Sequence, residues 1–339
     1  MGPRTLAWRI DATQQGQRLD HILAAALSRL LQREITRAQA RRLIEGGTVR
    51  CQARPERRAS CKPAAGSHLE VRFDPAMLGP VQPAASAGEI TWSADRILFE
   101  DAWLLAVDKP PGLPTQPTLD PRRASLFSTV QAWLRARDGA DSYLGLHHRL
   151  DRDTSGLVLF TKDRAANPGA AALFAGKTLR KTYQALAVAG PAVADAWTVD
   201  NYLGAVGRER QATRYGAVRS GGDPAQTEFR VLERLPDALF VEARPLTGRT
   251  HQIRVHLAEG GHPILGDTHY GGPRQVRAGS GGGMVTPPRV MLHAARLEFV
   301  HPMTGAALDL ACPLPADFAE CLQNLRPEGR GRPSAGPHR

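Results

Sequence analysis

The chain lacks the features that mark exported, membrane-spanning and zinc-binding proteins. Its first twenty residues hold no apolar run typical of a signal peptide, and no stretch approaches the ~18 apolar residues of a membrane-spanning helix. None of the four cysteines lies in a Cys-x-x-Cys pair, which argues against a zinc site or a redox motif. A glycine-rich phosphate-binding loop is also missing. We therefore expect a cytoplasmic protein that uses no metal and no cofactor.

Positive charge is what the chain has in excess, and it is concentrated near both ends. The net charge is +11 over 339 residues. Residues 1–73 hold 14 Arg and Lys against 6 Asp and Glu, and the last fourteen residues hold four Arg and one Glu. Residues 74–325 are therefore formally neutral. Charge gathered on end segments indicates a polyanionic partner such as RNA.

The N-terminal pattern predicts a small basic domain. Apolar residues from Leu19 to Leu31 recur at helical spacing, and a second helix is predicted from Thr36 to the glycines at 46 and 47. Strand-like runs follow at 48–50 and 69–73. We predict an α/β module over residues 17–73. The second helix carries the basic side chains that we expect to contact the polyanion, Arg37, Arg41 and Arg42.

Beyond this module the pattern changes to a linker and a larger, strand-rich domain. Residues 74–95 are rich in Pro, Ala and Gly and are predicted to be a linker, whereas the tail at 326–339 is predicted to be disordered. The domain between them, residues 96–325, has more strand-like runs than helices, and those runs alternate in polarity. This favours an α+β fold with a mainly antiparallel mixed sheet and flanking helices. Strands are predicted at 104–107, 157–161, 182–188, 227–232, 240–243 and 296–300, and helices at 126–137, 166–176 and 250–258.

The segment from His147 to Lys162 is the most informative part of the sequence. A polar, charged loop enters a buried strand at Leu157, and loops that feed rigid strands often carry catalytic groups. Asp151 and Asp153 each lie beside an arginine. Taken alone, two such carboxylates would more often cap a turn or pair with the neighbouring arginines.

This segment closely resembles the active-site motif of RluA-type pseudouridine synthases, His-Arg-Leu-Asp followed by a Thr-Ser-Gly-Leu-Leu pattern. The resemblance places the family's essential aspartate at Asp151. At Arg149 it places the arginine that helps to fill the space left by a flipped-out base. His148 and Thr154 belong to the same motif and are expected to contact the RNA.

Three further segments match the same family in the same order. The strand and Lys-Pro-x-Gly turn at 104–114 are similar to the family's opening segment, for which a structural role is expected. Lys181-Thr182-Tyr183 is similar to the strand whose tyrosine contacts the target base, although a strand tyrosine is by itself more often part of the core. Residues 244–257 closely resemble the third motif, with its basic residue at Arg254.

The third motif also contains Arg249 and His251, which the resemblance makes candidate substrate contacts. His251 and His256 would be a possible pair of metal ligands. No third ligand accompanies them in the sequence, and we expect no metal site here.

The N-terminal module is similar to a small RNA-binding module first seen in a small-subunit ribosomal protein. The Arg-Leu-Asp opening at 18–20 and the turn at 44–49 fit that module. The usual Val-Asn-Gly after the turn is replaced by Arg-Cys-Gln at 50–52. The alternative is a basic helix pair that only keeps the protein soluble. We favour RNA binding because the charge is clustered on one module.

The resemblance implies an isomerase that converts specific uridines in structured RNA to pseudouridine. Breaking the N-glycosidic bond develops positive charge on the ribose, and a nearby carboxylate can add to the sugar, stabilise that charge or take a neighbouring proton. Burial favours a neutral carboxyl group, whereas an adjacent guanidinium favours the ionised form. Arg254 is therefore the expected partner of Asp151, and Tyr183 is expected to retain the uracil and to assist proton removal. The target nucleotide must be flipped out of its stack.

Two other functions remain possible from the sequence. A non-catalytic RNA-binding or ribosome-assembly protein would need the basic module but not Asp151, Tyr183 and Arg254 together. A nucleoside hydrolase built on Asp151 and Asp153 would need opposed carboxylates, and two positions on one loop are poorly placed for that. Members of this family act on large-subunit ribosomal RNA, on transfer RNA or on both, and the N-terminal module favours ribosomal RNA. We expect a monomer.

Overall fold

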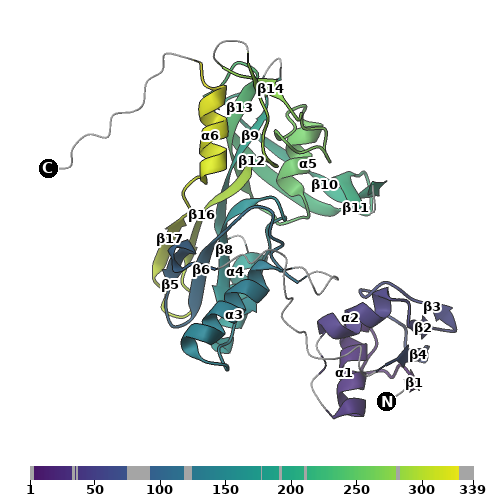
Figure 1. The fold of residues 1–339 in the computed structure, drawn as a ribbon. Coiled ribbons are helices and arrows are strands. Elements are labelled where there is room, and N and C mark those ends of the chain that lie inside the picture. Colours follow the sequence, from purple (N-terminus) through teal and green to yellow (C-terminus); the bar gives the residue numbers. More distant parts are fainter. Residues whose placement is uncertain are drawn as a thin grey trace. The chain divides into compact units, whose positions relative to one another are not determined.

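The structure, a computed structural model, describes residues 4–32, 35, 37–74, 92–117, 124–176, 178–190, 193–209, 212–279 and 283–327. These residues fall into two compact units, whose described parts are residues 4–74 and 92–327 (Figure 1). Thr36, residues 75–91 of the predicted linker and residues 328–339 of the predicted tail lie outside the described residues. Within the described ranges no helix is both long and apolar enough to cross a membrane.

The first unit consists of two helices packed on a small antiparallel sheet. The helices are α1 (Leu19–Leu31) and α2 (Arg37–Glu45). The apolar stripe of α1 is buried against the sheet, and Leu19, Leu23 and Leu27 are fully buried. The strand at Arg4–Arg9, which the sequence pattern did not predict, pairs antiparallel with the strand at His68–Phe73. The sheet order is β1-β4-β2-β3, with β1 at Arg4–Arg9, β2 at Val49–Cys51, β3 at Arg54–Pro55 and β4 at His68–Phe73.

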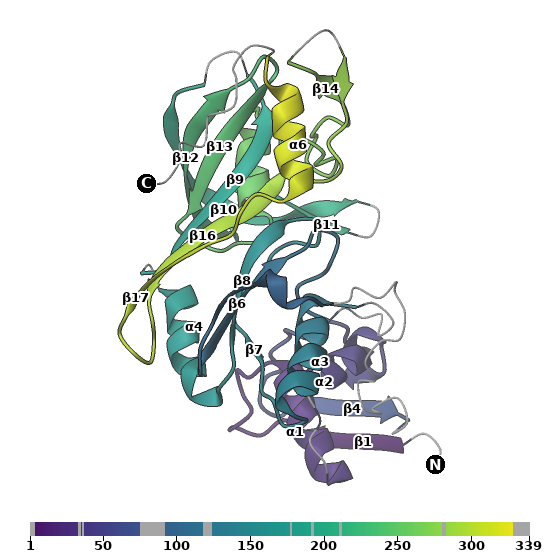
Figure 2. The same cartoon turned by 60° about the vertical axis from the view of Figure 1, so that its left-hand side comes forward.

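The second unit is built on one sheet of eleven strands (Figures 1 and 2). Its main path runs β11-β10-β12-β13-β9-β16-β8-β6-β5, with β17 paired to β16 and β7 paired to β8. All pairings are antiparallel except the short one between β16 and β8. The predicted α+β class with a mainly antiparallel mixed sheet is confirmed. The strands are β5 (Ile97–Glu100), β6 (Leu104–Lys109), β7 (Gly145–Leu146), β8 (Ser155–Thr161), β9 (Arg180–Val188), β10 (Ala196–Glu209), β11 (Ala212–Ala217), β12 (Asp223–Arg234), β13 (Ala238–Pro245), β16 (Leu292–Val300) and β17 (Ala307–Ala311).

Helices cover the sheet where its strands are apolar on both faces. Strands β6 and β8 alternate, so that Leu105 and Phe160 face one cluster and Leu104 and Leu159 face another. The first cluster includes α3 (Leu126–Asp138), and the second includes α4 (Asn167–Ala175). Short 3-10 helices η2 and η3 lie at Ala94–Arg96 and Arg164–Ala166, and a two-stranded ribbon joins β14 (Val276–Arg277) to β15 (Met284–Val285).

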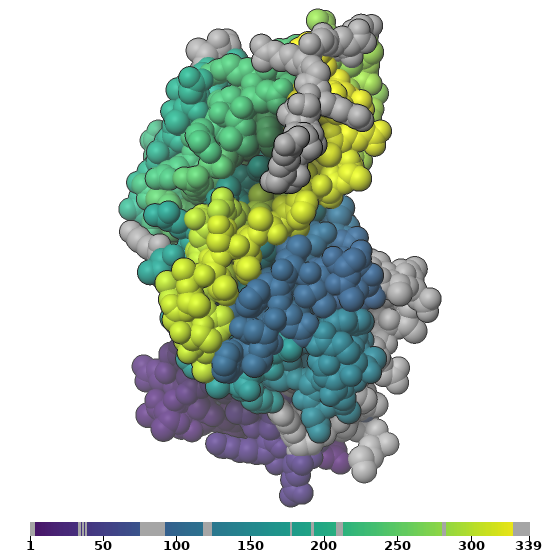
Figure 3. Space-filling view, turned by 90° about the vertical axis from the view of Figure 1, so that its left-hand side faces the viewer, coloured from purple at the N-terminus to yellow at the C-terminus, as the bar shows by residue number. Residues whose placement is uncertain are grey.

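Two helices cover the other half of the sheet. Helix α5 (Gln252–Glu259) follows β13, and α6 (Ala316–Leu325) follows β17. Residues 292–325 form the yellow strip in Figure 3, which runs between β5–β6 and the green strands of the other half. The predicted helices at 126–137, 166–176 and 250–258 correspond to α3, α4 and α5, with ends that differ by one or two residues. Helix α6 and the long β10–β11 hairpin were not predicted.

The two halves of the sheet meet at β16. This strand pairs antiparallel with β9 and, at His293 and Ala294, parallel with the start of β8. The backbones of β8 and β16 lie so close together at this point that position 156 requires a glycine. Gly156 has φ of +109°, and a Cβ there would lie 2.3 Å from the Ala294 carbonyl oxygen. The predicted motifs at Asp151, Tyr183 and Arg254 all border this junction.

Candidate active site

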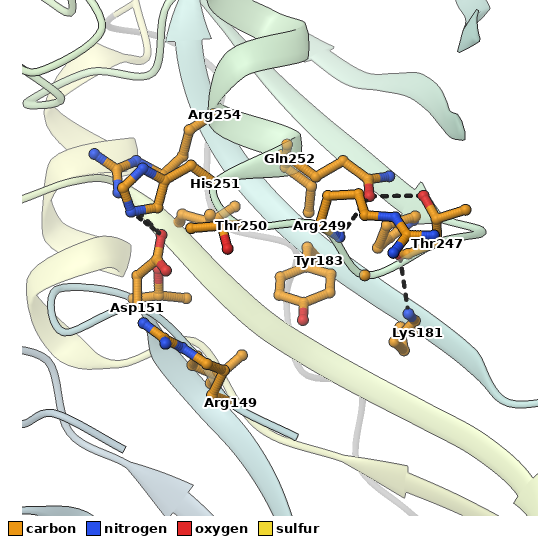
Figure 4. Close-up of a pocket in the computed structure, with 16 residues that line it drawn as sticks. Arg149, Asp151, Lys181, Tyr183, Thr247, Arg249, Thr250, His251, Gln252 and Arg254 are labelled. Carbon is orange, nitrogen blue, oxygen red and sulfur yellow. Dashed lines mark hydrogen bonds and ion pairs between the residues drawn. The ribbon is translucent and has the colours of Figure 1, made fainter. Parts of the chain in front are cut away.

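One pocket brings together the segments singled out in the sequence (Figure 4). Its walls come from the loop before β8, from β9, from the loop between β13 and α5, and from the start of β16. It is lined by Arg149, Leu150, Asp151, Thr154, Lys181, Tyr183, Pro245, Thr247, Gly248, Arg249, Thr250, His251, Gln252, Ile253, Arg254 and Leu292. Segments more than a hundred residues apart therefore share one cavity.

Asp151 and Arg254 form an ion pair across this pocket. The Arg254 Nη1 donates to Asp151 Oδ2 at 2.9 Å. The Arg254 side chain is 10% exposed and that of Asp151 is 21% exposed, so the carboxylate is the more accessible partner. A charge-assisted bond from a nearly buried guanidinium fixes the orientation of Asp151.

A second carboxylate, Asp267, binds the Nε and Nη2 side of the Arg254 guanidinium. Arg254 Nε and Nη2 donate to the two Asp267 oxygens at 2.7 and 2.8 Å, and Asp267 is 1% exposed. Burial alone lowers the pKa of Arg254, but the hydrogen bonds to Asp267 and the charges of Asp267 and Asp151 outweigh burial and raise that pKa. The guanidinium therefore stays charged, and Nη1 is left to bind Asp151.

His251 completes the polar wall beside Asp151. Its Nδ1 lies 2.8 Å from the Tyr270 hydroxyl, which itself accepts a hydrogen bond from the Tyr215 N–H. His251 Nε2 faces the acceptor Asp151 Oδ2 at 3.7 Å, which favours the proton on Nε2, so that Nδ1 accepts from the Tyr270 hydroxyl. Burial lowers the pKa of His251 to about 4, so its ring is neutral near pH 7. The ring of Tyr270 also lies 5.0 Å from the Arg254 guanidinium.

Tyr183 projects into the same pocket from β9 (Figure 4). Its register neighbours are Ala243 on β13 and Ala294 on β16, two small residues that leave room beside the ring. Burial and the charge of Asp151 raise the pKa of Tyr183. Its phenol is therefore protonated at neutral pH. The ring is also packed against the apolar clusters on both sides of the sheet junction, which holds it in place.

The backbone of the loop that carries Asp151 is fastened by buried side chains. The Thr115 hydroxyl donates to the Leu150 carbonyl at 2.7 Å and accepts from the Leu150 N–H at 3.0 Å. Lys109 is fully buried and donates to the Arg152 carbonyl at 2.9 Å. Burial lowers the pKa of Lys109 to about 7. This agrees with the structural role expected for its Lys-Pro turn.

The loop before α5 is fixed by Gln252. Its Oε1 accepts from the Thr247 hydroxyl and the Arg249 N–H, and its Nε2 donates to Thr227 Oγ1 at 2.9 Å. Arg249 lines the pocket and donates from Nε to the Pro224 carbonyl at 3.0 Å. The helix begins after His251, which takes a left-handed conformation with φ of 58°. This turn aims the His251 ring at Asp151.

The structure brings most of the predicted substrate-contact residues to the pocket, but not all of them. Arg149 and Thr154 line it; Arg149 is exposed and its guanidinium forms no hydrogen bond or ion pair with the residues that the structure describes. His148 does not line the pocket. Its Nε2 accepts from the Leu159 N–H at 2.9 Å, and its ring stacks on Phe174. Burial of the ring lowers the pKa of His148 to about 3, so the ring is neutral near pH 7.

The contacts of His256 also argue against a metal-binding role. Its Nδ1 lies 2.9 Å from Thr227 Oγ1 and its Nε2 lies 3.1 Å from Asn201 Oδ1. Among the residues that the structure describes, no group of three or more His, Cys, Asp or Glu side chains is placed to hold a metal ion.

The predicted basic residues of the first unit surround one buried carboxylate. Arg37 and Arg41, together with Arg18, donate to Asp20, which is fully buried. The side chains of Arg18, Arg37 and Arg41 are 39%, 54% and 40% exposed, so they form a positively charged edge around a single negative charge. Arg42 differs, because its Nη2 is buried and has no hydrogen-bond partner among the described residues.

Sequence reasoning missed Asp20, Asp267 and Tyr270. Each lies beside a residue that was singled out, and each holds an arginine or a histidine in place. Asp20 lay in the quoted Arg-Leu-Asp opening, but its partners became visible only with the packing of α1 on α2. Asp267 follows an apolar stretch and a glycine, a pattern that also fits an ordinary turn.

Comparisons with known proteins fit this site. Residues 103–259 match the family described as RNA pseudouridylate synthase. The chain is 33% identical over 325 residues to ribosomal large subunit pseudouridine synthase C of Vibrio vulnificus, covering 94% of this chain and 95% of that protein. It is 34% identical over 332 residues to the protein of the same name from Escherichia coli K12, with 94% and 95% covered.

Solved structures show the same relationship. Human RNA pseudouridylate synthase domain containing 4 superposes with a TM-score of 0.54 at 26% identity, covering 68% of this chain and 93% of that one. Human RNA pseudouridylate synthase domain containing 1 gives a TM-score of 0.53 at 26% identity, with 70% and 90% covered. The fold and the comparisons define an isomerase that acts on RNA. The chain belongs to the RNA pseudouridylate synthase family and is an RNA pseudouridine synthase.

Proposed function

We propose that this enzyme isomerises uridines of large-subunit ribosomal RNA, with Asp151 acting at the anomeric carbon of a flipped-out nucleotide. The RNA class is supported by the names of the relatives, which are 33% and 34% identical over nearly their whole length. The catalytic assignment is supported by the pocket at the sheet junction. The single observation that carries it is the 2.9 Å ion pair between Asp151 Oδ2 and Arg254 Nη1.

The reaction needs a carboxylate that is ionised yet shielded from most water. Cleavage of the bond between uracil N1 and ribose C1′ leaves positive charge on the sugar. Asp151 then adds to C1′ or takes the proton from C2′, and both routes require its charged form. Arg254, held from behind by Asp267, supplies the opposing charge without competing for the reacting oxygen, because Asp151 has a second oxygen that no described side chain binds.

The detached uracil must remain in the pocket until it is rejoined. It turns so that C5 bonds to C1′; this breaks the bond between Asp151 and C1′ or, on the other route, Asp151 returns the proton to C2′. C5 then loses its proton, and N1 gains one. Tyr183 provides an aromatic face for retention, and its hydroxyl can relay the C5 proton, since the protonated phenol can donate as it accepts.

Arg149 is suited to occupying the gap that the flipped nucleotide leaves. Its guanidinium is exposed and uses none of its donors on the described residues, so it can stack on a neighbouring base or bind a phosphate. Unstacking a base costs a few kcal/mol, and such contacts offset part of that cost.

The first unit is proposed to dock the RNA. Asp20 holds Arg18, Arg37 and Arg41 in a fixed arrangement while leaving 39% to 54% of each arginine side chain exposed. Three cations around one buried anion leave excess positive charge at the surface. Such an edge fits the phosphate backbone rather than particular bases.

Chemical mapping of pseudouridine tests the RNA assignment directly. Ribosomal and transfer RNA from cells with and without this protein are mapped, and unmodified large-subunit ribosomal RNA is incubated with the purified enzyme. We expect sites in large-subunit ribosomal RNA to remain uridine in cells without this protein, and to become pseudouridine when that RNA is incubated with the purified enzyme. Loss confined to transfer RNA would contradict the ribosomal assignment.

Replacing Tyr183 by Phe is expected to slow product formation while preserving RNA affinity. The ring that retains uracil remains, but the hydroxyl that relays the proton is removed, and general acid–base groups typically contribute roughly a hundredfold or more. Single-turnover rates measure the effect. Tyr202→Phe, on the exposed face of β10, is the control. Equal rates for the two variants would remove the hydroxyl from the mechanism.

Replacing Arg37 and Arg41 together by Gln is expected to weaken RNA binding and to flatten its salt dependence. For each phosphate that the protein no longer neutralises, the slope of log K against log salt should fall by about 0.7 to 0.9. Affinity measured at several salt concentrations provides the slope. Arg58→Gln is the control, because Arg58 and Glu56 form a one-to-one ion pair, whereas three arginines share Asp20. An unchanged slope in the double variant would exclude this edge from docking.

A further inference from the structure

Arg289 is a nearly buried arginine that the reaction itself does not use. It lies between β15 and β16, and its side chain is 8% exposed. Its Nε and Nη2 donate to the two carboxylate oxygens of Asp317, at 2.6 and 3.0 Å. Asp317 lies in the first turn of α6. This bidentate pair fixes the plane of the guanidinium relative to the helix.

The other donors of Arg289 reach the loop that carries Asp151. Nη1 donates to the Asp153 carbonyl at 3.2 Å, and Nη2 donates to Ser155 Oγ at 3.0 Å. These contacts lie two and four residues after Asp151. Thr115 and Lys109 hold residues 150 and 152 of this loop, and Arg289 contacts residues 153 and 155.

The direction of the Ser155 hydrogen bond extends this connection into the core. The Cys312 carbonyl can only accept, so His293 carries its proton on Nε2 and donates to that carbonyl at 3.1 Å. His293 Nδ1 of the neutral ring therefore accepts from the Ser155 hydroxyl at 3.0 Å, and Ser155 Oγ accepts from Arg289. Burial lowers the pKa of His293, which keeps the ring neutral and this chain of donors intact.

The backbone of Arg289 also abuts the loop that carries Asp267. Gly266 has φ of +77°, and a Cβ there would lie 1.9 Å from the Arg289 carbonyl oxygen. The next residue, Asp267, binds Arg254 through two hydrogen bonds. Arg289 therefore touches both loops whose carboxylates share the Arg254 guanidinium.

We propose that the Arg289–Asp317 pair is a positioning device, through which helix α6 sets the distance between the Asp151 loop and Arg254. The inference rests on the proposed catalytic role of Asp151. A loop shift of about 1 Å would lengthen the 2.9 Å bond from Arg254 to Asp151, and misplacements of that size can cost about a hundredfold in rate. Neither Arg289 nor Asp317 needs to touch the RNA for this effect.

The test compares Asp317→Asn, Asp317→Glu and Arg289→Lys with the unaltered full-length chain. The RNA is a transcript that spans a uridine located by the mapping experiment. Single-turnover rate at saturating enzyme, RNA dissociation constant and unfolding temperature are measured for each. Asp309→Asn is the matched control, since it weakens another Arg–Asp pair, with Arg296 between β16 and β17, away from the pocket. Asp151→Asn is measured in parallel.

We expect Asp317→Asn and Arg289→Lys to lower the single-turnover rate about tenfold, with the dissociation constant within twofold of the unaltered value. Asp317→Glu should recover at least part of the rate, because it restores the charge. Asp309→Asn should leave the rate unchanged. If Asp317→Asn lowers the unfolding temperature but retains the full rate in assays run well below that temperature, the pair is merely structural and the proposal fails. If Asp151→Asn is active, the proposed mechanism fails, irrespective of the Asp317 result.

Discussion

Asp151→Asn is expected to abolish isomerisation while leaving RNA affinity nearly intact. The amide is almost the same size as the carboxylate and can still accept a hydrogen bond from Arg254, so the pocket keeps its shape. It carries no charge to stabilise the sugar cation and is a far weaker nucleophile and base. We expect single-turnover product formation to fall at least about a thousandfold, which corresponds to roughly 4 kcal/mol of transition-state stabilisation.

Asp153→Asn is the appropriate comparison for this variant. Asp153 lies two residues away on the same loop, and its carboxylate is paired with Arg152 at 2.8 and 2.9 Å. The same chemical change at this position should reduce the rate only slightly. Product formation by Asp151→Asn at the rate of Asp153→Asn would remove Asp151 from the reaction.

Arg254→Met is expected to impair both stability and catalysis. It leaves Asp267, which is 1% exposed, without the guanidinium that binds both of its oxygens. Breaking a buried ion pair from one side typically costs about 3 to 5 kcal/mol of unfolding free energy. The loss of the hydrogen bond to Asp151 should also lower the single-turnover rate by roughly a hundredfold to a thousandfold. Denaturant unfolding and single-turnover kinetics measure the two effects.

Combining Arg254→Met with Asp267→Asn separates these two effects. The second change removes the uncompensated buried charge, so most of the unfolding free energy should return. The rate should remain low, since no cation faces Asp151. A double variant that regains full activity would show that Arg254 only neutralises Asp267.

The segments that line the pocket were predictable because each motif is a local pattern of residues. The spacing from Arg149 to Thr154 specifies a polar loop entering a buried strand, and the structure has that loop before β8. The sequence pattern predicted that Tyr183 lies on a strand. It did not predict that the small residues Ala243 and Ala294 lie next to Tyr183 on the neighbouring strands and leave room for its ring. The pairing of Asp151 with Arg254 was expected from charge and chemistry, and the observed 2.9 Å contact agrees with that expectation.

What the sequence did not reveal depends on contacts between distant segments. Asp267 and Asp317 each stand near the start of a turn or helix, where an aspartate is common for local reasons. Their arginine partners lie 13 and 28 residues away, respectively, and no short-range pattern encodes such pairs. His148 was expected to contact RNA because of its place in a motif; its ring stacks on Phe174, and it does not line the pocket.

The position of β16 has a consequence for how the enzyme forms during synthesis. This strand lies between β9 and β8, so the half of the sheet that leads to Asp151 and the half that carries Tyr183 are joined by residues 292–300. During translation, Asp151, Tyr183 and Arg254 are therefore synthesised before β16, the strand that joins the two halves of the sheet. We therefore expect the nascent protein to lack an assembled pocket, and to be inactive on RNA, until the C-terminal part of the chain has emerged.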